Sequence, residues 1–545
     1  APLSLTFDRL MDTELTAAAI RTEPPAALAP SWRGATLILT PLQPLASGTN
    51  YQLTIGREAA DVDGNGLARP FSLRFSTVST GLRVETLVPA DGSAGAAPLS
   101  PIAIIFDRPI DPGSVAGALT ITPPVDGRLE VVGLPRDAPP TSLPEPGPTA
   151  SLPTTVPVKA PPIGPLRVLQ FTPGAPLAGH TTFTVQLRPG AVRALDASQV
   201  AAGQSWTFTT GSAPDRLQNQ IVFRSARTGI TNIWAMNPDG TNARQVTAEL
   251  TPVTSYDVSS DGSTLVFATA GVVKRMALPG AATTVVTRSE AAEYAPRLHP
   301  AGGSVLVARR DRGTGRDAGL WLLPLGDSSP AEQRLLQPGC DRLGSVAPPF
   351  GSADAPAAAY DPDGRAGAWA TATAFSPDGA VLLVTCGSGD VIRVDTSSGA
   401  ATFLSLREPI GPPVWAPAHD AFAVAAIGPG SRSGTWFVGR AGLPAAGPDL
   451  AAWPSATATG ALVGISATRP GRVAYQPPLG PMTLLTLTPE LLDRQPVFSP
   501  AGDAILFVRV AEDEPTRSEG IWLMAPDGRE LRQLSPGGSD PRWLP

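Results

Sequence analysis

The chain contains few histidines and cysteines, two of the side-chain types that often perform catalysis. It has three histidines, His180, His299 and His419, and the last two occupy equivalent turn positions in two repeats. A general base needs a nucleophile within hydrogen-bond reach, and turns in different repeats give no reason to expect one. The sequence lacks a Gly-x-Ser-x-Gly elbow, a phosphate-binding loop and a cysteine–histidine cluster with zinc spacing. We therefore expect a protein that is not an enzyme, with no catalytic, cofactor-binding or metal-binding residues and no cofactor.

One segment matches the front half of a calcium-binding loop. Asp61, Asp63 and Asn65 place oxygen atoms at alternate positions, as such loops do. The twelfth position is Ser72, where the pattern requires a glutamate that binds the ion with both oxygens. Asp-Gly pairs elsewhere are expected to form turns, because aspartate accepts backbone N–H bonds and glycine adopts positive φ. The five pairs within residues 213–545 begin at positions 239, 261, 363, 378 and 527.

Length and composition predict an all-β protein with several domains. A chain of 545 residues with 55 glycines and 62 prolines has too many turn-forming residues for a helical protein. The formal net charge is −6 and no stretch is strongly basic, which argues against nucleic-acid binding. The longest apolar runs are far shorter than a membrane-spanning helix needs. The two cysteines, Cys340 and Cys386, are compatible with one disulfide or with two free thiols.

A long repeat organises the N-terminal part of the chain. Leu5 to Asp12 (LTFDRLMD) returns as Ile104 to Asp111 (IIFDRPID), and two later segments return in the same order. Each copy combines alternating strands with turn signals about every ten residues, which is typical of an antiparallel sandwich. We therefore expect two β-sandwiches, over residues 1–78 and 79–212.

The motifs in both copies resemble those of the bacterial Ig-like domain first associated with S-layer proteins. The first copy carries Phe7, Met11, Asp12, Pro41, Leu45, Gly48, Tyr51, Asp61, Gly64, Asn65, Phe75 and Thr77 of that pattern. The second copy carries Pro89 to Gly92, Phe106, Asp111, Pro173, Leu177, Gly179, Phe208 and Thr210, and replaces the Asp-x-x-Gly-Asn turn with Leu195 to Gln199. In the family the stretch around Asp61 is an Asx-rich turn, so the resemblance favours a turn over a calcium site.

The two copies differ in ways that bear on partners. The first copy has only Ala1 to Ser4 before its Phe-Asp strand, so its first strand is missing and one sheet edge is open. Either the polypeptide extends upstream of Ala1, or another subunit adds a strand to the edge. The second copy contains a proline-rich insertion over residues 134–165, which is expected to form a surface loop or, alternatively, a docking arm.

A shorter repeat fills residues 213–545. Its unit of roughly 40 residues contains four strands, which is the signature of a propeller blade. Copies begin near Asp257, Arg297, Ala374, Val414, Val463 and Val497, and an insertion interrupts them at residues 340–372. The terminal segment Arg542 to Leu544 supplies the strand missing from the partial copy at Ile221, which closes the ring. The count is seven blades, or six if the weak copy near Val463 is not a complete blade.

Segments such as Asn232 to Gly240 and Ile521 to Gly528 resemble the repeat of TolB-type propellers. Four tryptophans recur at one blade position, which predicts packing between blades or, alternatively, a surface for stacking a sugar or peptide. They are Trp234, Trp321, Trp436 and Trp522. Tyr256, Tyr294 and Arg297 are expected to line the mouth of the channel.

The expected function follows from these resemblances rather than from composition. They imply a non-enzymatic exported protein of the bacterial cell surface, whose Ig-like domains present or assemble the propeller in a surface layer or filament. Its partners would be proteins, including copies of itself through the open edge of the first domain. The alternative is a periplasmic or extracellular binding module whose propeller face captures a protein, peptide or glycan.

Overall fold

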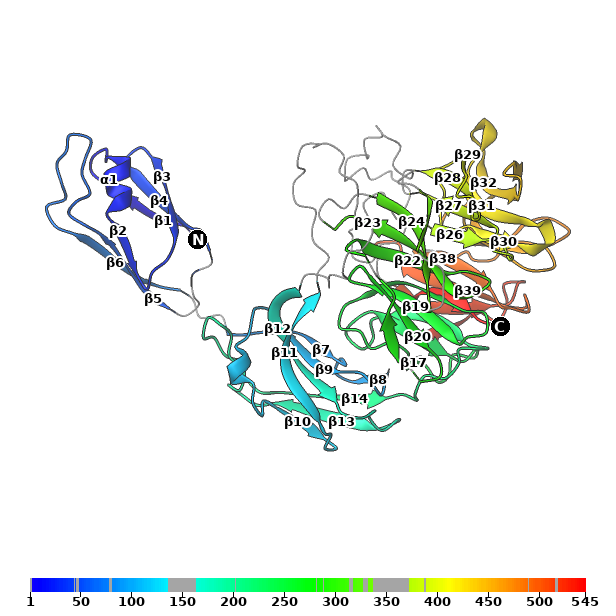
Figure 1. Ribbon diagram of the computed structural model, residues 1–545, viewed down its shortest axis with the longest axis horizontal. Helices are drawn as coiled ribbons and strands as arrows, with labels where there is room; N and C mark the ends of the chain where they lie inside the picture. Colours follow the sequence, from blue (N-terminus) through cyan, green and yellow to red (C-terminus); the bar gives the residue numbers. More distant parts are fainter. Residues whose placement is uncertain are drawn as a thin grey trace.

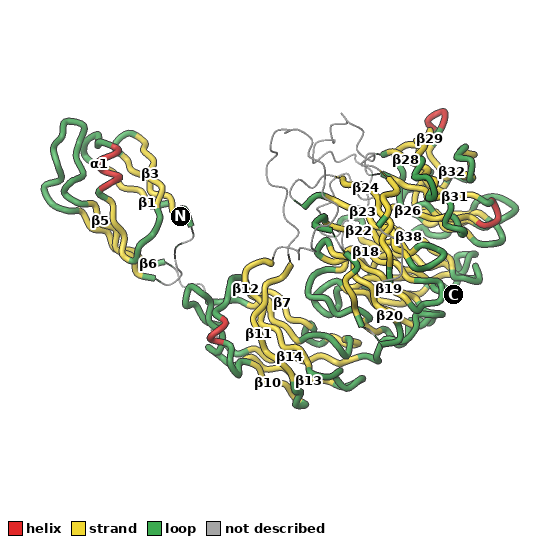
Figure 2. Tube along the Cα trace, viewed as in Figure 1, coloured by secondary structure: helices red, strands yellow, loops and turns green. Residues whose placement is uncertain are grey.

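Figure 1 shows the computed structural model of the chain, in which a first sandwich, a second sandwich and a propeller follow one another. Strands and turns make up nearly all of the described chain, with a few helical turns (Figure 2). The structure describes residues 2–43, 45, 49–77, 81–135, 163–200, 202–280, 282–287, 289–312, 317–326, 332–336, 372–386, 389–488, 490–514 and 518–545.

The first sandwich consists of two three-stranded sheets around an apolar core. One sheet contains β1 (Leu3–Thr6), β4 (Thr36–Pro41) and β3 (Leu28–Arg33) in that order, and the other contains β2 (Ile20–Glu23), β5 (Asn50–Ile55) and β6 (Phe71–Ser76). Alternation along β4 turns Leu37 and Leu39 into the core, where both are fully buried. The helix α1 (Thr13–Ala18) begins after Asp12, whose carboxylate accepts hydrogen bonds from the first-turn backbone N–H groups.

The second sandwich has two four-stranded sheets. One contains β11 (Gly127–Pro135), β12 (Ile163–Pro173), β9 (Ile102–Phe106) and β7 (Val84–Val88), and the other contains β10 (Leu119–Thr122), β13 (Thr182–Leu187), β14 (Gln204–Thr210) and β8 (Ser93–Ala96). The short 3-10 helix η1 (Pro112–Ser114) follows Asp111, whose side chain caps it. All residues of β9 are buried, because this central strand is covered on both faces.

In the described residues the first sandwich has two strands fewer than the second. Its strands β1, β4 and β3 correspond in order and pairing to β9, β12 and β11, and β2, β5 and β6 correspond to β10, β13 and β14. Within the described residues nothing corresponds to β7 or β8. Among the described residues, β1 and β6 are therefore the edge strands on this side of the first sandwich.

The remaining described strands form seven four-stranded sets. In order from the inner strand outward, the first set is β42 (Ser539–Trp543), β15 (Ile221–Ser225), β16 (Asn232–Met236) and β17 (Arg244–Gln245), the second is β18 (Val253–Val258), β19 (Thr264–Thr269), β20 (Val272–Ala277) and β21 (Thr283–Val285), and the third is β22 (Ala292–Leu298), β23 (Ser304–Arg310), β24 (Asp317–Pro324) and β25 (Gln333–Leu336). The fourth set is β26 (Ala372–Phe375), β27 (Val381–Thr385), β28 (Asp390–Asp395) and β29 (Ala401–Arg407), and the fifth is β30 (Val414–Ala416), β31 (Ala421–Ile427), β32 (Ser433–Gly439) and β33 (Pro444–Ala446). The sixth set is β34 (Leu450–Ala456), β35 (Leu462–Ser466), β36 (Val473–Gln476) and β37 (Thr483–Leu484), and the seventh is β38 (Leu491–Phe498), β39 (Ile505–Ala511), β40 (Ser518–Met524) and β41 (Arg532–Ser535). Short 3-10 helices, η2 (Pro417–His419) and η3 (Pro429–Ser431), lie in turns of the fifth set. One residue pair, between β29 and β31, joins the fourth and fifth sets into a single eight-stranded sheet.

The last strand of the chain pairs with the strand that begins the propeller, as the sequence predicts. Trp543 lies opposite Ile221 and Arg542 lies opposite Val222 in an antiparallel ladder. Apolar side chains of this set pack against those of the seventh set on one face and of the second set on the other. The terminal strands are therefore covered on both faces.

The start of the sixth set that we predict from the sequence is wrong. The copy expected to begin at Val463 begins at Leu450, and Val463 lies in the second strand of the set. In four inner strands a residue with positive φ precedes a proline, namely Ala295, Trp453, Gln495 and Asp540. The sixth set has this feature but lacks the Ser-Pro-x-Gly turn, which among the turns after the inner strands is complete only at residues 376–379 and 499–502, so the turn did not reveal where this set begins.

Most of both predicted insertions lies outside the described residues. Of the segment 134–165, the structure describes only the end of β11 and the start of β12. Of the segment 340–372, it describes only Ala372, the first residue of β26.

Candidate functional site

The second sandwich is attached to the propeller through an apolar layer. Val88, Ala103, Ile105 and Val168 are buried on the outer face of its β7–β9–β12 sheet, and Leu250 of the propeller packs against them. The opposite face of the same sheet covers the core of the sandwich. Because the sheet is apolar on both faces, separating the sandwich from the propeller would expose a second hydrophobic surface to water.

Backbone contacts add to this joint. The backbone N–H of Ala90 donates to the carbonyl oxygen of Thr228 at 3.0 Å. A Cβ atom on Gly95 would lie 2.6 Å from the carbonyl oxygen of Ala243 and 3.1 Å from the ring of Trp234. Gly95 also has a φ of +80°, which residues with a side chain rarely adopt. Both the close approach and the backbone conformation therefore require glycine at this position.

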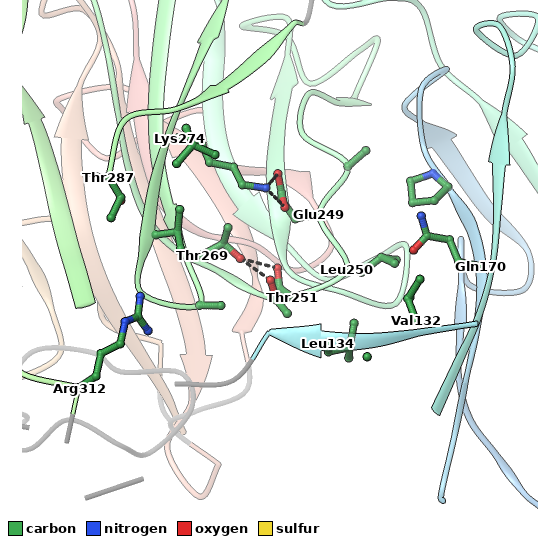
Figure 3. Close-up of a pocket in the computed structure, with 16 residues that line it drawn as sticks. Val132, Leu134, Gln170, Glu249, Leu250, Thr251, Thr269, Lys274, Thr287 and Arg312 are labelled. Carbon is green, nitrogen blue, oxygen red and sulfur yellow. Dashed lines mark hydrogen bonds and ion pairs between the residues drawn. The ribbon is translucent and has the colours of Figure 1, made fainter. Parts of the chain in front are cut away.

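A cleft opens where the joint ends. Its volume is about 600 Å³, and Figure 3 shows it between strand β11 of the second sandwich and the propeller. Val132 and Leu134 form the sandwich wall, whereas Leu250, Val272 and Val285 contribute apolar surface from the propeller. The apolar layer of the joint continues into this cleft, because Val132, Leu134 and Leu250 belong to both.

The polar groups of the cleft are arranged in pairs on the propeller wall. The Lys274 ammonium donates to both carboxylate oxygens of Glu249, at 3.0 and 2.8 Å. The hydroxyls of Thr251 and Thr269 lie 2.6 Å apart (Figure 3). The Arg312 guanidinium, which also lines the cleft, donates to the backbone carbonyl oxygens of Glu290 and Gly271. Since these charged groups already have partners, the arrangement suits binding of a largely apolar group better than proton transfer.

The three histidines lie in separate places. His180 has positive φ in a turn of the second sandwich. His299 accepts a hydrogen bond from the Ala301 backbone on its Nδ1 and packs edge-on against Phe375, whereas the His419 ring stacks on Phe437. The structure does not bring the histidines together, and their contacts are those of turn residues.

The structure gives the Asp61 segment the geometry of a turn. Asp61 Oδ1 accepts hydrogen bonds from the backbone N–H groups of Asn65 at 2.8 Å and Asp63 at 3.1 Å, and Oδ2 accepts from the Asn65 amide at 3.0 Å and from Arg9 at 3.3 Å. These bonds, above all those from Asn65, hold the pKa of Asp61 below its ordinary value. Since both carboxylate oxygens already accept protein donors, the segment is explained without a calcium ion.

The four recurring tryptophans pack between neighbouring blades, as the first of the two interpretations predicts. Trp234 packs with side chains of the first and seventh sets, and Trp436 with those of the fourth and fifth. Arginines cover the rings: the Arg309 guanidinium lies 4.3 Å from the ring centre of Trp321, and that of Arg509 lies 4.8 Å from Trp522.

The residues expected at the channel mouth have mainly structural contacts. Tyr256 is buried, and its hydroxyl lies 2.9 Å from the carbonyl oxygen of Val222. Burial raises the pKa of this hydroxyl. Asp257 forms ion pairs with Arg297, at 3.5 Å, and with Arg542 of the terminal strand. Sequence reasoning selected Tyr256 and Arg297, but their contacts join neighbouring blades to the closing strand.

Cys386 is disulfide-bonded and almost fully buried. The only other cysteine of the chain, Cys340, lies outside the described residues. Of the two alternatives left open by the sequence, the structure supports the disulfide.

The described ranges contain neither a cluster of metal ligands nor a helix that could span a membrane. Among these residues no group of three or more histidine, cysteine, aspartate and glutamate side chains could hold a metal ion. No helix in this part of the chain is both long and apolar enough to span a bilayer.

Fold and contacts define a class of protein: β-sandwiches joined to a propeller that displays an interdomain cleft. Residues 1–77 and residues 78–210 each match the bacterial Ig-like domain family, so the chain carries two such domains at its N-terminus.

Solved structures similar to the chain are propeller proteins. TolB from Acinetobacter baumannii is 16% identical, with coverage of 67% of this chain and 79% of that chain and a TM-score of 0.35. A putative TolB from Agrobacterium tumefaciens is 16% identical over 60% and 92% of the two chains, with a TM-score of 0.29. An oligogalacturonate lyase from Vibrio parahaemolyticus is 10% identical over 55% and 85%, with a TM-score of 0.38. No curated protein matches the sequence significantly.

Proposed function

We propose that the protein is a non-enzymatic, exported protein of the bacterial cell surface that acts through contacts with other proteins. The apolar joint carries this proposal, because it fixes the second sandwich to the propeller while the first sandwich remains free of it (Figure 1). In this view the chain divides at residues 78 and 212, and the Ig-like domains present or assemble the propeller in a surface layer or filament.

The disulfide of Cys386 supports export. Disulfides persist in oxidising compartments and are rare in the cytosol, where thiols are kept reduced. The matches of the N-terminal residues to bacterial Ig-like domains agree with a location outside the cytoplasm. Among the described residues β1 and β6 end their sheets, and an unpaired strand edge is a template for another chain, which supports assembly.

Two measurements test this proposal. Intact cells of the source bacterium should be labelled by an impermeant reagent that reacts with the protein, whereas recovery in the cytoplasmic fraction alone would contradict export. The purified chain should associate with itself as its concentration rises in sedimentation velocity. A Ser4→Lys variant on the open edge strand β1 should weaken association, and Ser31→Lys on the opposite edge strand β3 serves as the matched control.

The cleft favours a second candidate, a binding module that captures a ligand. Its volume of about 600 Å³ and its apolar walls suit a small apolar group or an apolar side chain of a peptide. The cleft lies at the joint rather than on the propeller axis where the sequence placed this function. A Thr251→Trp variant fills the cleft, so it should abolish any ligand-dependent rise in melting temperature that the wild-type chain shows.

A further inference from the structure

Two edge strands border the cleft between the second sandwich and the propeller. Among the described residues, β11 ends its sheet in the second sandwich and β21 ends the second set of the propeller. Val132 and Leu134 of β11 line one wall (Figure 3) with Gly133 between them, and Val285 of β21 lines the other wall. Because glycine has no side chain, Gly133 presents its backbone to the cleft. The cleft therefore combines apolar side chains with main-chain groups of an edge strand.

Strand β11 has room for a further strand. It pairs only with β12, so one side of its backbone has no strand partner among the described residues. Its hairpin with β12 also extends beyond β9, because β9 pairs with β12 over Val168 to Phe171 whereas β11 pairs with it from Ile163 to Pro173. A two-stranded ribbon is marginally stable in water, and a third strand stabilises it.

The side chains along this edge determine which partner it suits. Arg128 and Glu130 form an ion pair at 3.2 Å, and Arg128 is 81% exposed, so polar side chains of a partner suit this half of β11. Val132 and its neighbours in the cleft are apolar, so an aliphatic side chain suits the other half. Glu249 and Lys274 already pair with each other, so a charge brought into the cleft would find no free counter-charge in this pair.

We infer that the cleft receives an extended segment of another protein, which adds to β11 as a strand and inserts an aliphatic side chain between Val132, Leu250 and Val285. This rests on the second candidate function, in which the cleft captures a ligand, and specifies that ligand as a peptide strand. The strand pairs along the regular register from Gly127 to Val132. The bulge at Gly133 ends the pairing there. Main-chain hydrogen bonds provide affinity, and the side chain in the cleft provides specificity.

The first test uses the full chain and a fluorescent peptide, Lys-Thr-Val-Thr-Leu-Thr-Val-Lys, which alternates polar and aliphatic side chains. It should bind saturably at one site per chain in fluorescence anisotropy. Two modified peptides carry N-methyl groups either on the threonines or on the aliphatic residues, and each modification blocks one edge of the strand. Only one of them should bind at least 10-fold more weakly, because only one edge faces β11. Equal affinities of both modified peptides, or no saturable binding by the parent peptide, would overturn the proposal.

Hydrogen exchange locates the bound peptide. At saturation, exchange of the backbone amides in residues 127–132 should slow, because these amides gain a strand partner. The control lies within the same chain: β3 is the corresponding edge strand of the first sandwich, and its exchange should not change. Protection confined to the propeller wall would overturn strand addition, yet it would leave capture of a ligand by the cleft intact.

A charge on the propeller wall tests the apolar end of the strand. Val285 is 59% exposed, so Val285→Asp should leave the fold unchanged while placing a carboxylate in the cleft. This variant should bind the peptide at least 10-fold more weakly. Thr283→Asp is the matched control, because Thr283 is also exposed on β21 but is not among the residues that line the cleft. Equal affinities of the two variants would contradict insertion of a side chain at this wall.

A shortened chain distinguishes a partner from the connection between β11 and β12 in this chain, which lies outside the described residues. When residues 137–161 are replaced by a short Gly-Ser linker, the peptide should bind with the same affinity as to the full chain. Binding to the shortened chain alone would show that this chain fills the edge itself, and the proposal would be wrong. None of these results depends on where the protein resides, so surface labelling can succeed or fail independently.

Discussion

Arg224 and Asp540 lie 316 residues apart in the sequence, yet Arg224 Nε donates a hydrogen bond to Asp540 Oδ2 at 2.7 Å. Arg224 is 2% exposed, and its other amino group donates to the carbonyl oxygens of Val253, at 3.2 Å, and Thr254, at 2.8 Å. One side chain therefore links the closing strand β42, its neighbour β15 and the inner strand of the next set. This contact unites the two ends of the propeller.

Replacing Asp540 by asparagine should destabilise the propeller by about 3 kcal/mol, because it leaves the buried Arg224 cation without its counter-charge. Urea denaturation followed by tryptophan fluorescence measures the loss. The control is Glu130→Ala, which removes the partner of Arg128, a side chain that is 81% exposed, and should cost less than about 1 kcal/mol. Equal effects of the two variants would show that the closing contact does not stabilise the ring.

Gly95→Ala should loosen the joint between the second sandwich and the propeller. The added Cβ would lie 2.6 Å from the carbonyl oxygen of Ala243, which directly precedes β17, and 3.1 Å from the ring of Trp234 in β16. We expect faster proteolysis between the two domains and a larger radius of gyration in small-angle X-ray scattering.

Gly92→Ala is the matched control for the joint. Gly92 also has positive φ, +69°, but nothing lies within 4 Å of the position that a Cβ atom would take. Backbone strain alone would affect both variants similarly, whereas loss of the joint is expected for the Gly95 variant only. If both variants change the scattering profile equally, strain rather than close approach explains the effect.

The sequence predicted those parts of the fold that repeat within the chain. Paired copies identified both sandwiches, and the terminal segment identified the pairing of Trp543 with Ile221. The joint was not predicted, because Val88 and Leu250 belong to different repeats and nothing local links them. The cleft follows from that joint, so its lining residues were missed as well. Glycine at position 95, inside a strand, was the one signal available, since such glycines mark close backbone approach.

Acid should weaken the propeller through three aspartates in turns. Hydrogen bonds from neighbouring serines, together with backbone N–H groups, lower the pKa of Asp261, Asp378 and Asp395 from 3.8 to about 2. A carboxyl group whose pKa is lower in the folded state stabilises that state above its unfolded pKa. This contribution is therefore complete above about pH 4 and is lost as the pH falls towards 2.

Asparagine at all three positions removes the titration while keeping a side-chain acceptor. The triple variant, Asp261→Asn with Asp378→Asn and Asp395→Asn, should show a shallower fall in melting temperature between pH 4 and pH 2 than the wild-type chain. Calorimetry at several pH values measures this slope. Parallel slopes would mean that other carboxylates govern acid unfolding.

Reduction of the Cys386 disulfide should lower the stability of the propeller by about 2–4 kcal/mol, because the bond restricts the unfolded chain. Cys386 is 4% exposed and packs with Leu382 and Ile392, so the folded ring should resist reductant until it opens. The melting temperature with and without dithiothreitol measures the effect. In a Cys386→Ala variant the reductant should no longer shift it, and a shift that persists there would trace the effect to something other than this bond.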